Sequence, residues 1–174
     1  GFLLQRTNVF VVSETEKSGM VGPVDFITHA LLGAAVGELM LGRRMGNRAL
    51  WWGGLAGILP DWDVLLAPFF STTNQLWWRQ GPSHSLPVMA LVAFALSRWL
   101  AKIWKKDKIA RAQAGWFVYA AMVAHVLTDC FTVEGASVLW PLPMKPVAIG
   151  NLYHIDPLFT LPLLVTLVWL SFLT

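Results

Sequence analysis

Charged side chains are scarce in this chain of 174 residues. Asp, Glu, Lys and Arg together make up 13% of it, and 56% of the residues are hydrophobic, whereas about a quarter of a soluble domain is charged. This composition excludes an ordinary soluble domain and indicates an integral membrane protein. The ten tryptophans fit that interpretation, because indole rings gather at the boundary between lipid tails and headgroups.

Cysteine is nearly absent as well. Cys130 stands alone, so an intramolecular disulfide is excluded. The chain also lacks an H-E-x-x-H motif, which counts against an intramembrane metalloprotease. Its formal charge is +3, but the basic residues gather in two short connections, as membrane topology requires. We therefore expect no direct binding of nucleic acid.

We expect two parts along the chain: an N-terminal extension at residues 1–20 and one membrane-embedded domain at residues 21–174. The apolar run Val9–Val12 is too short for the core of a signal peptide, and a polar stretch follows it. The extension carries no recognisable chemistry.

Five apolar segments predict an all-α, polytopic membrane bundle in which some helices are short or broken. They are residues 26–41, 49–70, 85–104, 114–131 and 152–174. The first is short for a full crossing, which takes about 20 residues. The second contains Leu59-Pro60-Asp61, and a break is expected near Leu59 because proline lacks an amide donor. Broken helices at membrane depth usually line a cavity.

The distribution of basic residues predicts the orientation. Nine of the thirteen lie in or around two connections on one side: Arg43, Arg44 and Arg48, and then Arg98, Lys102, Lys105, Lys106, Lys108 and Arg111. Short loops rich in Lys and Arg stay cytoplasmic. Measured from that side, the candidate ligands described below lie about 18–30 Å along their helices. We therefore expect them to converge in the outer half of the membrane.

His125 and Asp129 are four residues apart, which places both on one face of a helix. This spacing suits two ligands of one metal ion, or one ligand and the residue that orients it. The alternative is a histidine at a helix end beside a solvated aspartate.

Asp61 and Asp63 follow the proline of the second segment. A local break would let one carboxylate turn inward, where it could bind a cation or act as a general base. The alternative is that Pro60-Asp61 only starts a turn or caps the next helix.

His84 follows a Gly-Pro turn at the head of the third segment, with Ser83 or Ser85 available as a helix cap. An imidazole held at a helix start is well placed to bind a metal ion through one ring nitrogen while the other finds a hydrogen-bond partner.

His29 shares a helix face with Gly33 and Gly37. Small residues permit close approach of helices in lipid, so this stripe would bury His29 against a neighbour. For Asp25 and Thr28 the alternative is a helix N-cap, which we favour for Asp25.

The last outer loop adds further candidates. Thr132, Glu134 and Gly135 could line the mouth of a site, while His154 and Asp156 could supply late ligands or orient a substrate.

Taken together and in this order, these motifs resemble the YdjM-like family, described as LexA-binding, inner-membrane-associated, metal-dependent hydrolases. The pattern opens with D-x-x-T-H-A-L-x-G, continues with L-P-D-x-D and T/S-H-S, and ends with H-x-L-x-D-x-x-T-x-x-G and a downstream W-P. The match covers residues 23–157. Membership would imply a membrane-bound metal-dependent hydrolase.

The motifs are also distantly similar to zinc-dependent phospholipase C. This resemblance implies that His29, His84, His125 and Asp129 are metal ligands and that Asp61 is a ligand or a base. The chain lacks that enzyme's N-terminal tryptophan ligand and its H-x-x-x-E pair, so one or two divalent ions are expected instead of three, and the resemblance implies that they are zinc. The family motif has Arg-Gly before T/S-H-S, and Arg79 of this chain could clamp an anionic group.

These observations predict a multi-pass protein of the bacterial inner membrane whose site opens to the non-cytoplasmic side. The expected reaction is hydrolysis of an amphipathic phosphoester, such as a phospholipid, by metal-activated water, with Asp61 or Asp63 as the base and Arg79 stabilising the developing charge. His154 remains a candidate ligand. The alternative is a membrane protein that binds or transports a cation without catalysis. Membrane lipids are the expected surroundings, and a protein partner stays open.

Overall fold

The computed structural model of the chain describes residues 23–62, 82–132, 135–142, 147–150 and 157–173. Its α-helices are α1 (Pro23–Met45), α2 (Arg48–Gly57), α5 (Leu86–Ile103), α6 (Arg111–Phe131) and α7 (Pro157–Leu173). Short 3₁₀ turns are η1 (Leu59–Asp61), η3 (Pro82–His84) and η4 (Trp104–Asp107). Across these described ranges the β pairing is limited to an isolated bridge between Ala136 and Val147. The predicted all-α fold is confirmed.

Helix α1 is longer than the apolar segment 26–41 that predicted it. Its last turn contains Arg43 and Arg44, which are good helix formers and interact favourably with the negative end of the helix dipole. The helix ends at Met45, and Gly46 follows with φ +56°. Glycine adopts this left-handed conformation without steric cost, so the chain turns back at once into α2.

Helices α1 and α2 pack through glycine against glycine. A Cβ atom at Gly33 would collide with the carbonyl oxygen of Gly53 and would lie 2.7 Å from the Cα of Gly57. A Cβ at Gly57 would in turn collide with the carbonyl oxygen of His29. The small-residue stripe therefore brings the backbone of His29 against a neighbouring helix, as predicted, and the structure identifies that neighbour as the end of α2.

Helix α6 is the centre of the bundle and contacts α1, α2 and α5. Trp104 is fully buried beside it, with its ring edge-on to Phe117 at 5.7 Å and to Trp52 at 5.3 Å. Other buried apolar side chains complete this core: Leu41, Met45, Met89, Ala93, Val118, Met122 and Val126. The core fixes the position of α6, which carries two of the candidate ligands.

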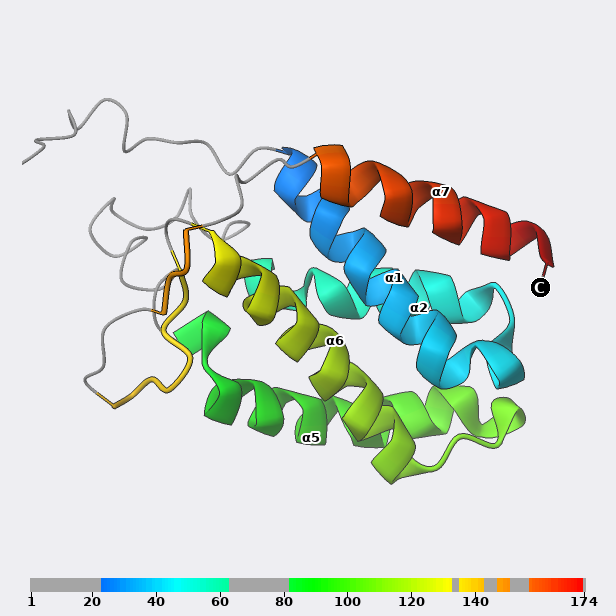
Figure 1. Cartoon of the computed structure of the whole chain (residues 1–174). Helices are drawn as coiled ribbons and strands as arrows, with labels where there is room; N and C mark the ends of the chain where they lie inside the picture. Colours follow the sequence, from blue (N-terminus) through cyan, green and yellow to red (C-terminus); the bar gives the residue numbers. More distant parts are fainter. Residues whose placement is uncertain (1–22, 63–81, 133–134, 143–146, 151–156, 174) are drawn as a thin grey trace, which may run out of the picture.

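The bundle has two distinct ends, which are separated along the helices in Figure 1. One end holds the turn between α1 and α2 and the turn between α5 and α6, both of which are basic in sequence. The other end holds the starts of α1, α5 and α7 and the ends of α2 and α6. The structure brings the segments that carry His29, Asp61, His84, His125 and Asp129 together at this end, as predicted, while His154 lies outside the described residues and the depth in a membrane stays a prediction.

The surface of the bundle suits a lipid environment. Two helical stretches, Leu86–Asp107 and Arg111–Phe131, are long and apolar enough to cross a membrane, and the apolar stretch Leu158–Phe172 is shorter. Large apolar side chains project outward from several helices, among them Leu39, Trp51, Leu91 and Phe172. Only α1 among the named elements makes more than marginal contact with α7 in the described structure. The number of membrane crossings stays a prediction.

Candidate metal centre

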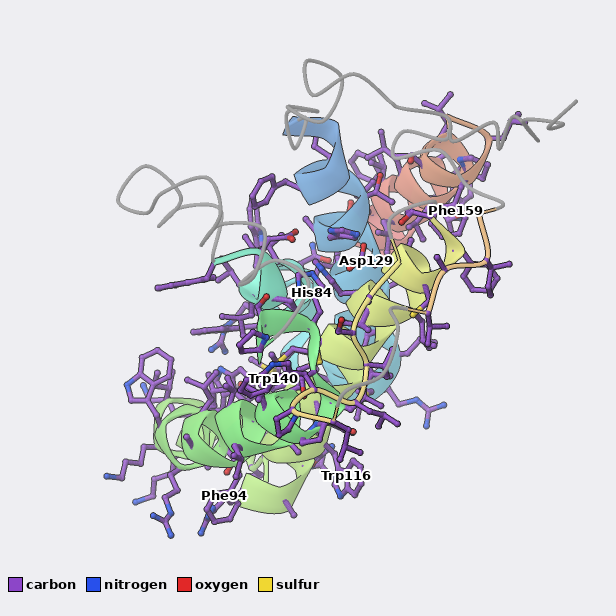
Figure 2. All side chains as sticks on the ribbon, turned by 90° about the vertical axis from the view of Figure 1, so that its left-hand side faces the viewer. His84, Phe94, Trp116, Asp129, Trp140 and Phe159 are labelled. Atoms are coloured by element: carbon purple, nitrogen blue, oxygen red, sulfur yellow. The ribbon has the colours of Figure 1, made fainter. Side chains whose placement is uncertain are left out.

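Three imidazoles and two carboxylates meet at the end of the bundle opposite the basic turns. His29 comes from α1, Asp61 from η1, His84 from η3, and His125 and Asp129 from α6. Figure 2 looks toward this end and shows His84 and Asp129 next to each other in the interior. The four residues other than Asp129 are buried, and His125 is only 1% exposed. With neutral imidazoles the cluster carries two negative charges, which one divalent cation would balance.

The distances within the cluster match those between ligands of one metal ion. The Nε2 atoms of His84 and His125 are 3.4 Å apart, and Asp129 Oδ2 lies 3.3 and 3.2 Å from them. Asp61 Oδ1 lies 3.9 Å from His84 Nε2 and 3.6 Å from His125 Nε2. Ligand atoms that surround a tetrahedral zinc ion at about 2.0–2.2 Å are about 3.3–3.6 Å from one another. A divalent cation therefore fits among these atoms.

The carboxylate of Asp129 gives independent evidence of this fit. Its Oδ2 atom is buried and makes no hydrogen bond of good geometry within the described residues, although two imidazole nitrogens lie within 3.3 Å. Buried carboxylate oxygens normally have a partner. A carboxylate oxygen and imidazole nitrogens that converge on one point are the arrangement expected of metal ligands.

A backbone carbonyl determines which nitrogen of His125 faces the cluster. His125 Nδ1 donates a hydrogen bond of 2.7 Å to the carbonyl oxygen of Gly57. A carbonyl oxygen can only accept, so the proton of the neutral ring is on Nδ1 and the lone pair of Nε2 points to the cluster. Metal-binding histidines usually have such a partner for their second nitrogen.

The break after α2 makes that carbonyl available. In a continuous helix the carbonyl of Gly57 would accept the amide of Asp61, four residues on. Here the amide of Asp61 donates instead to Ile58, at 3.2 Å, within the 3₁₀ turn η1. Pro60, which has no amide proton, lies in this turn. The predicted break is confirmed; it frees the Gly57 carbonyl for His125 and directs Asp61 inward.

His29 bridges the two carboxylates. Its Nδ1 donates to Asp61 Oδ2 at 3.0 Å, and its Nε2 lies 3.2 Å from Asp129 Oδ1. Its ring also packs against that of His125, with centroids 3.7 Å apart. This geometry fits two roles, which are a ligand through Nε2 and a positioning residue that holds Asp61.

The helix start beside His84 differs from the prediction. Ser85 occupies the N-cap position of α5, but its side chain makes no capping bond. Its hydroxyl donates to the carbonyl of Trp140 at 2.6 Å, which ties α5 to the outer loop. The hydroxyl of Ser83 is hydrogen-bonded to His84 Nδ1 at 2.8 Å. The two serines thus position the imidazole and the loop, and a hydroxyl cap at Ser85 was wrong.

The cap hypotheses for α1 were also wrong. The helix begins at Pro23, so Asp25 lies inside its first turn. Thr28 lies further inside, and its hydroxyl is hydrogen-bonded to that of Thr160 on α7, at 3.0 Å. This bond fastens the start of α7 next to His29.

At the end of α6, the hydroxyl of Thr132 donates a hydrogen bond to the backbone carbonyl of Asp129 at 2.7 Å.

Several candidates lie outside the described residues. They are Asp63, Arg79, Glu134, His154 and Asp156. Their assignment as base, anion clamp, ligand or mouth residue stays a prediction. Sequence reasoning missed the carbonyl of Gly57, whose only local signal is the missing amide donor of Pro60.

The comparisons with known proteins agree with this architecture. A family model described as YdjM inner membrane protein matches residues 24–173. Inner membrane protein YbcI of Escherichia coli (strain K12) is 30% identical to the chain over 117 residues, which are 67% of this chain and 66% of that protein. The match thus spans just under two thirds of the relative's length. No solved structure matches the chain.

Proposed function

The chain belongs to the YdjM inner membrane protein family, as its motifs predicted, and we propose that it is a divalent-cation-dependent hydrolase of amphipathic phosphoesters such as phospholipids. The inner membrane is its location. A multi-pass topology, with the metal centre facing the non-cytoplasmic side, is part of the proposal. This orientation is supported by the position of the cluster at the end of the bundle opposite the basic turns.

One observation carries the proposal. His84 Nε2, His125 Nε2 and Asp129 Oδ2 form a triangle with sides of 3.2–3.4 Å, and Asp61 Oδ1 lies beside it at the longer distances of 3.6 and 3.9 Å. Catalytic zinc sites typically have three protein ligands and one open position, whereas structural sites have four tight ligands. The looser fourth group distinguishes Asp61 from the three proposed ligands.

The roles of the residues follow from this difference. Zinc or a similar cation, when bound, acidifies water and polarises a phosphoryl oxygen. His84, His125 and Asp129 would hold the cation. Asp61 Oδ1 would accept the proton of the attacking water, and His29 holds the other oxygen of that carboxylate through its Nδ1–H. A base held in place by a second residue is preorganised for proton transfer.

The proposed substrate class comes from the surroundings of the cluster. Large apolar side chains that are exposed lie next to its residues in the chain: Ile27 before His29, Trp62 after Asp61, and Leu127 and Phe131 around Asp129. A polar substrate would gain nothing from these groups. Because residues two apart on a helix lie on opposite faces, these side chains point outward from the helices that carry the cluster. They suit acyl chains that surround this end of the bundle while a phosphate reaches the cluster.

The decisive experiment measures bound metal and hydrolysis together. The protein is purified in neutral detergent, its metal content is determined by elemental analysis, and turnover is tested on phosphatidylglycerol, phosphatidylethanolamine and a chromogenic phosphodiester. We expect Asp61→Asn to keep the cation and to lose at least about 100-fold in turnover, as loss of a general base does. His84→Ala should lose both. Asp107→Asn, at the other end of the bundle, is the control and should change neither.

A bound cation without hydrolysis of any substrate in the panel would contradict the proposal and favour the alternative, a cation-binding or transporting protein. One observation bears on transport. Glu38 lies nine residues along α1 from His29, about 13 Å toward the basic end, and its Oε2 is buried without a hydrogen-bond partner among the described residues. Between them α1 has only apolar residues and glycine, so a continuous polar path is not favoured.

A further inference from the structure

Two arginines from different helices contact one exposed aromatic ring near the basic end of the bundle. The guanidinium carbon of Arg98, on α5, lies 5.4 Å from the centroid of the Phe94 ring, and that of Arg111, the first residue of α6, lies 4.7 Å from it. Each contact is a cation–π interaction. Together they place two positive charges, one from each helix, next to the same ring.

These charges are not neutralised by the protein. In the part of the chain that the structure describes, neither guanidinium makes an ion pair, whereas Arg48 pairs with Asp107 at 3.0 Å. Arg111 donates through Nε to the buried hydroxyl of Ser97, at 3.3 Å, so its orientation is set while its terminal nitrogens stay available. Two unpaired positive charges on neighbouring helices favour an anion bound beside them.

The surface next to the arginines is apolar. Phe94 and Leu91, both more than half exposed, lie one and two turns before Arg98 on α5 and continue toward the middle of the helix. Figure 2 shows Phe94 projecting from the outside of the bundle. A soluble anion would use only the charged part of this surface. A phospholipid would use both parts, with its phosphate against the exposed guanidinium groups and an acyl chain along Leu91 and Phe94.

We propose that Arg98, Arg111 and Phe94 form a binding site for the phosphate of an anionic glycerophospholipid in the leaflet at the basic end of the bundle. The site is separate from the metal centre, because Arg98 lies 14 residues beyond His84, about 20 Å along the helix. The bound lipid is therefore not the substrate of the proposed hydrolase. Planar guanidinium groups suit this ligand because they can bond phosphate oxygens in pairs.

Binding of single lipids to the full chain in neutral detergent tests this site. Native mass spectrometry or a thermal-shift titration is carried out with phosphatidylglycerol and with zwitterionic phosphatidylcholine. We expect the double variant Arg98→Gln/Arg111→Gln to bind phosphatidylglycerol about tenfold more weakly than the unmodified protein. The matched control, Lys105→Gln/Lys106→Gln, removes the same charge from exposed side chains in η4 and should stay within about twofold. Cation binding at the metal centre, measured in every variant, reports correct folding.

Equal weakening in the two double variants would overturn the proposal, because diffuse attraction by the basic end would then explain binding. Equal affinity for the two lipids would also overturn it. Binding of inorganic phosphate is measured as the last comparison. If it bound with the same dependence on the two arginines while phosphatidylglycerol did not bind, the ligand would be a free anion and the lipid assignment would be wrong. If the glutamine variant does not fold, Arg98→Lys/Arg111→Lys replaces it, because this variant keeps both positive charges. Lysine cannot form the paired hydrogen bonds of a guanidinium group, so this variant should still bind phosphatidylglycerol more weakly than the unmodified protein.

Discussion

Replacement of Asp129 by asparagine tests the metal centre most directly. Asparagine has the shape of aspartate and keeps one oxygen, but it loses the negative charge. Asp129 lies within 3.3 Å of three imidazole nitrogens, those of His29, His84 and His125. We expect cation affinity to fall at least about 100-fold, equivalent to about 2.7 kcal/mol.

Thermal unfolding in detergent measures this loss. At a free zinc concentration 100 times its dissociation constant, binding stabilises the unmodified protein by about 2.7 kcal/mol. The Asp129→Asn variant would then be at its own dissociation constant, where binding contributes about 0.4 kcal/mol. The rise in Tm on adding zinc should therefore shrink, in the Asp129→Asn variant, to about a sixth of the rise in the unmodified protein.

The control and the choice of cation sharpen the result. Asp107→Asn removes a carboxylate at the opposite end, which pairs with Arg48, and should leave the zinc-induced rise in Tm unchanged. Because imidazole nitrogens dominate the ligand set, zinc should stabilise the protein more than magnesium or calcium. The reasoning is refuted if Asp129→Asn shows the full zinc-induced rise in Tm while remaining folded by circular dichroism.

Three further predictions concern packing, the helix break and topology. Gly53→Ala should destabilise the protein by about 1–3 kcal/mol, because the added Cβ would lie 2.8 Å from a backbone Cα of α1, whereas Gly54→Ala meets only ordinary contacts at 3.4 Å and should be neutral or stabilising in chemical unfolding. Pro60→Ala restores an amide donor to the turn, so we expect at least about tenfold weaker cation binding with little change in helix content; unchanged affinity in calorimetry would contradict this. A cysteine introduced at Leu142 should react with a membrane-impermeant thiol reagent added outside the cell, and one at Lys106 should react only after the membrane is opened; the reverse pattern would invert the topology.

Short-range relationships in the site were predictable from the sequence. The four-residue spacing of His125 and Asp129 places them on one face of α6, and they do meet, with Nε2 and Oδ2 3.2 Å apart. Proline predicts a break near Leu59, and α2 does end there. These relations depend only on helix geometry and on one missing amide, which neighbouring residues determine.

Long-range relationships were not predictable in the same way. The glycines of α1 indicated a close neighbour, but nothing in the local pattern identified α2 as that neighbour or Gly57 as the point of contact. Ser83 or Ser85 was expected to cap α5, and the hydroxyl of Ser85 instead reaches Trp140, 55 residues away in the chain. Such choices depend on which segments the whole bundle brings together, because a hydroxyl satisfies a distant carbonyl as well as a local amide.

Gly57 explains why the break and the glycine stripe occur together. The absence of a side chain lets the backbone of His29 approach the end of α2, since any Cβ there would collide with the carbonyl of His29. Its own carbonyl, released from helix bonding by the turn through Pro60, orients His125. A continuous helix would occupy that carbonyl, and a larger residue would push α1 away. One residue without a functional side chain therefore sets the positions of two histidines, so substitutions at Gly57 should affect cation binding as much as substitutions of the ligands.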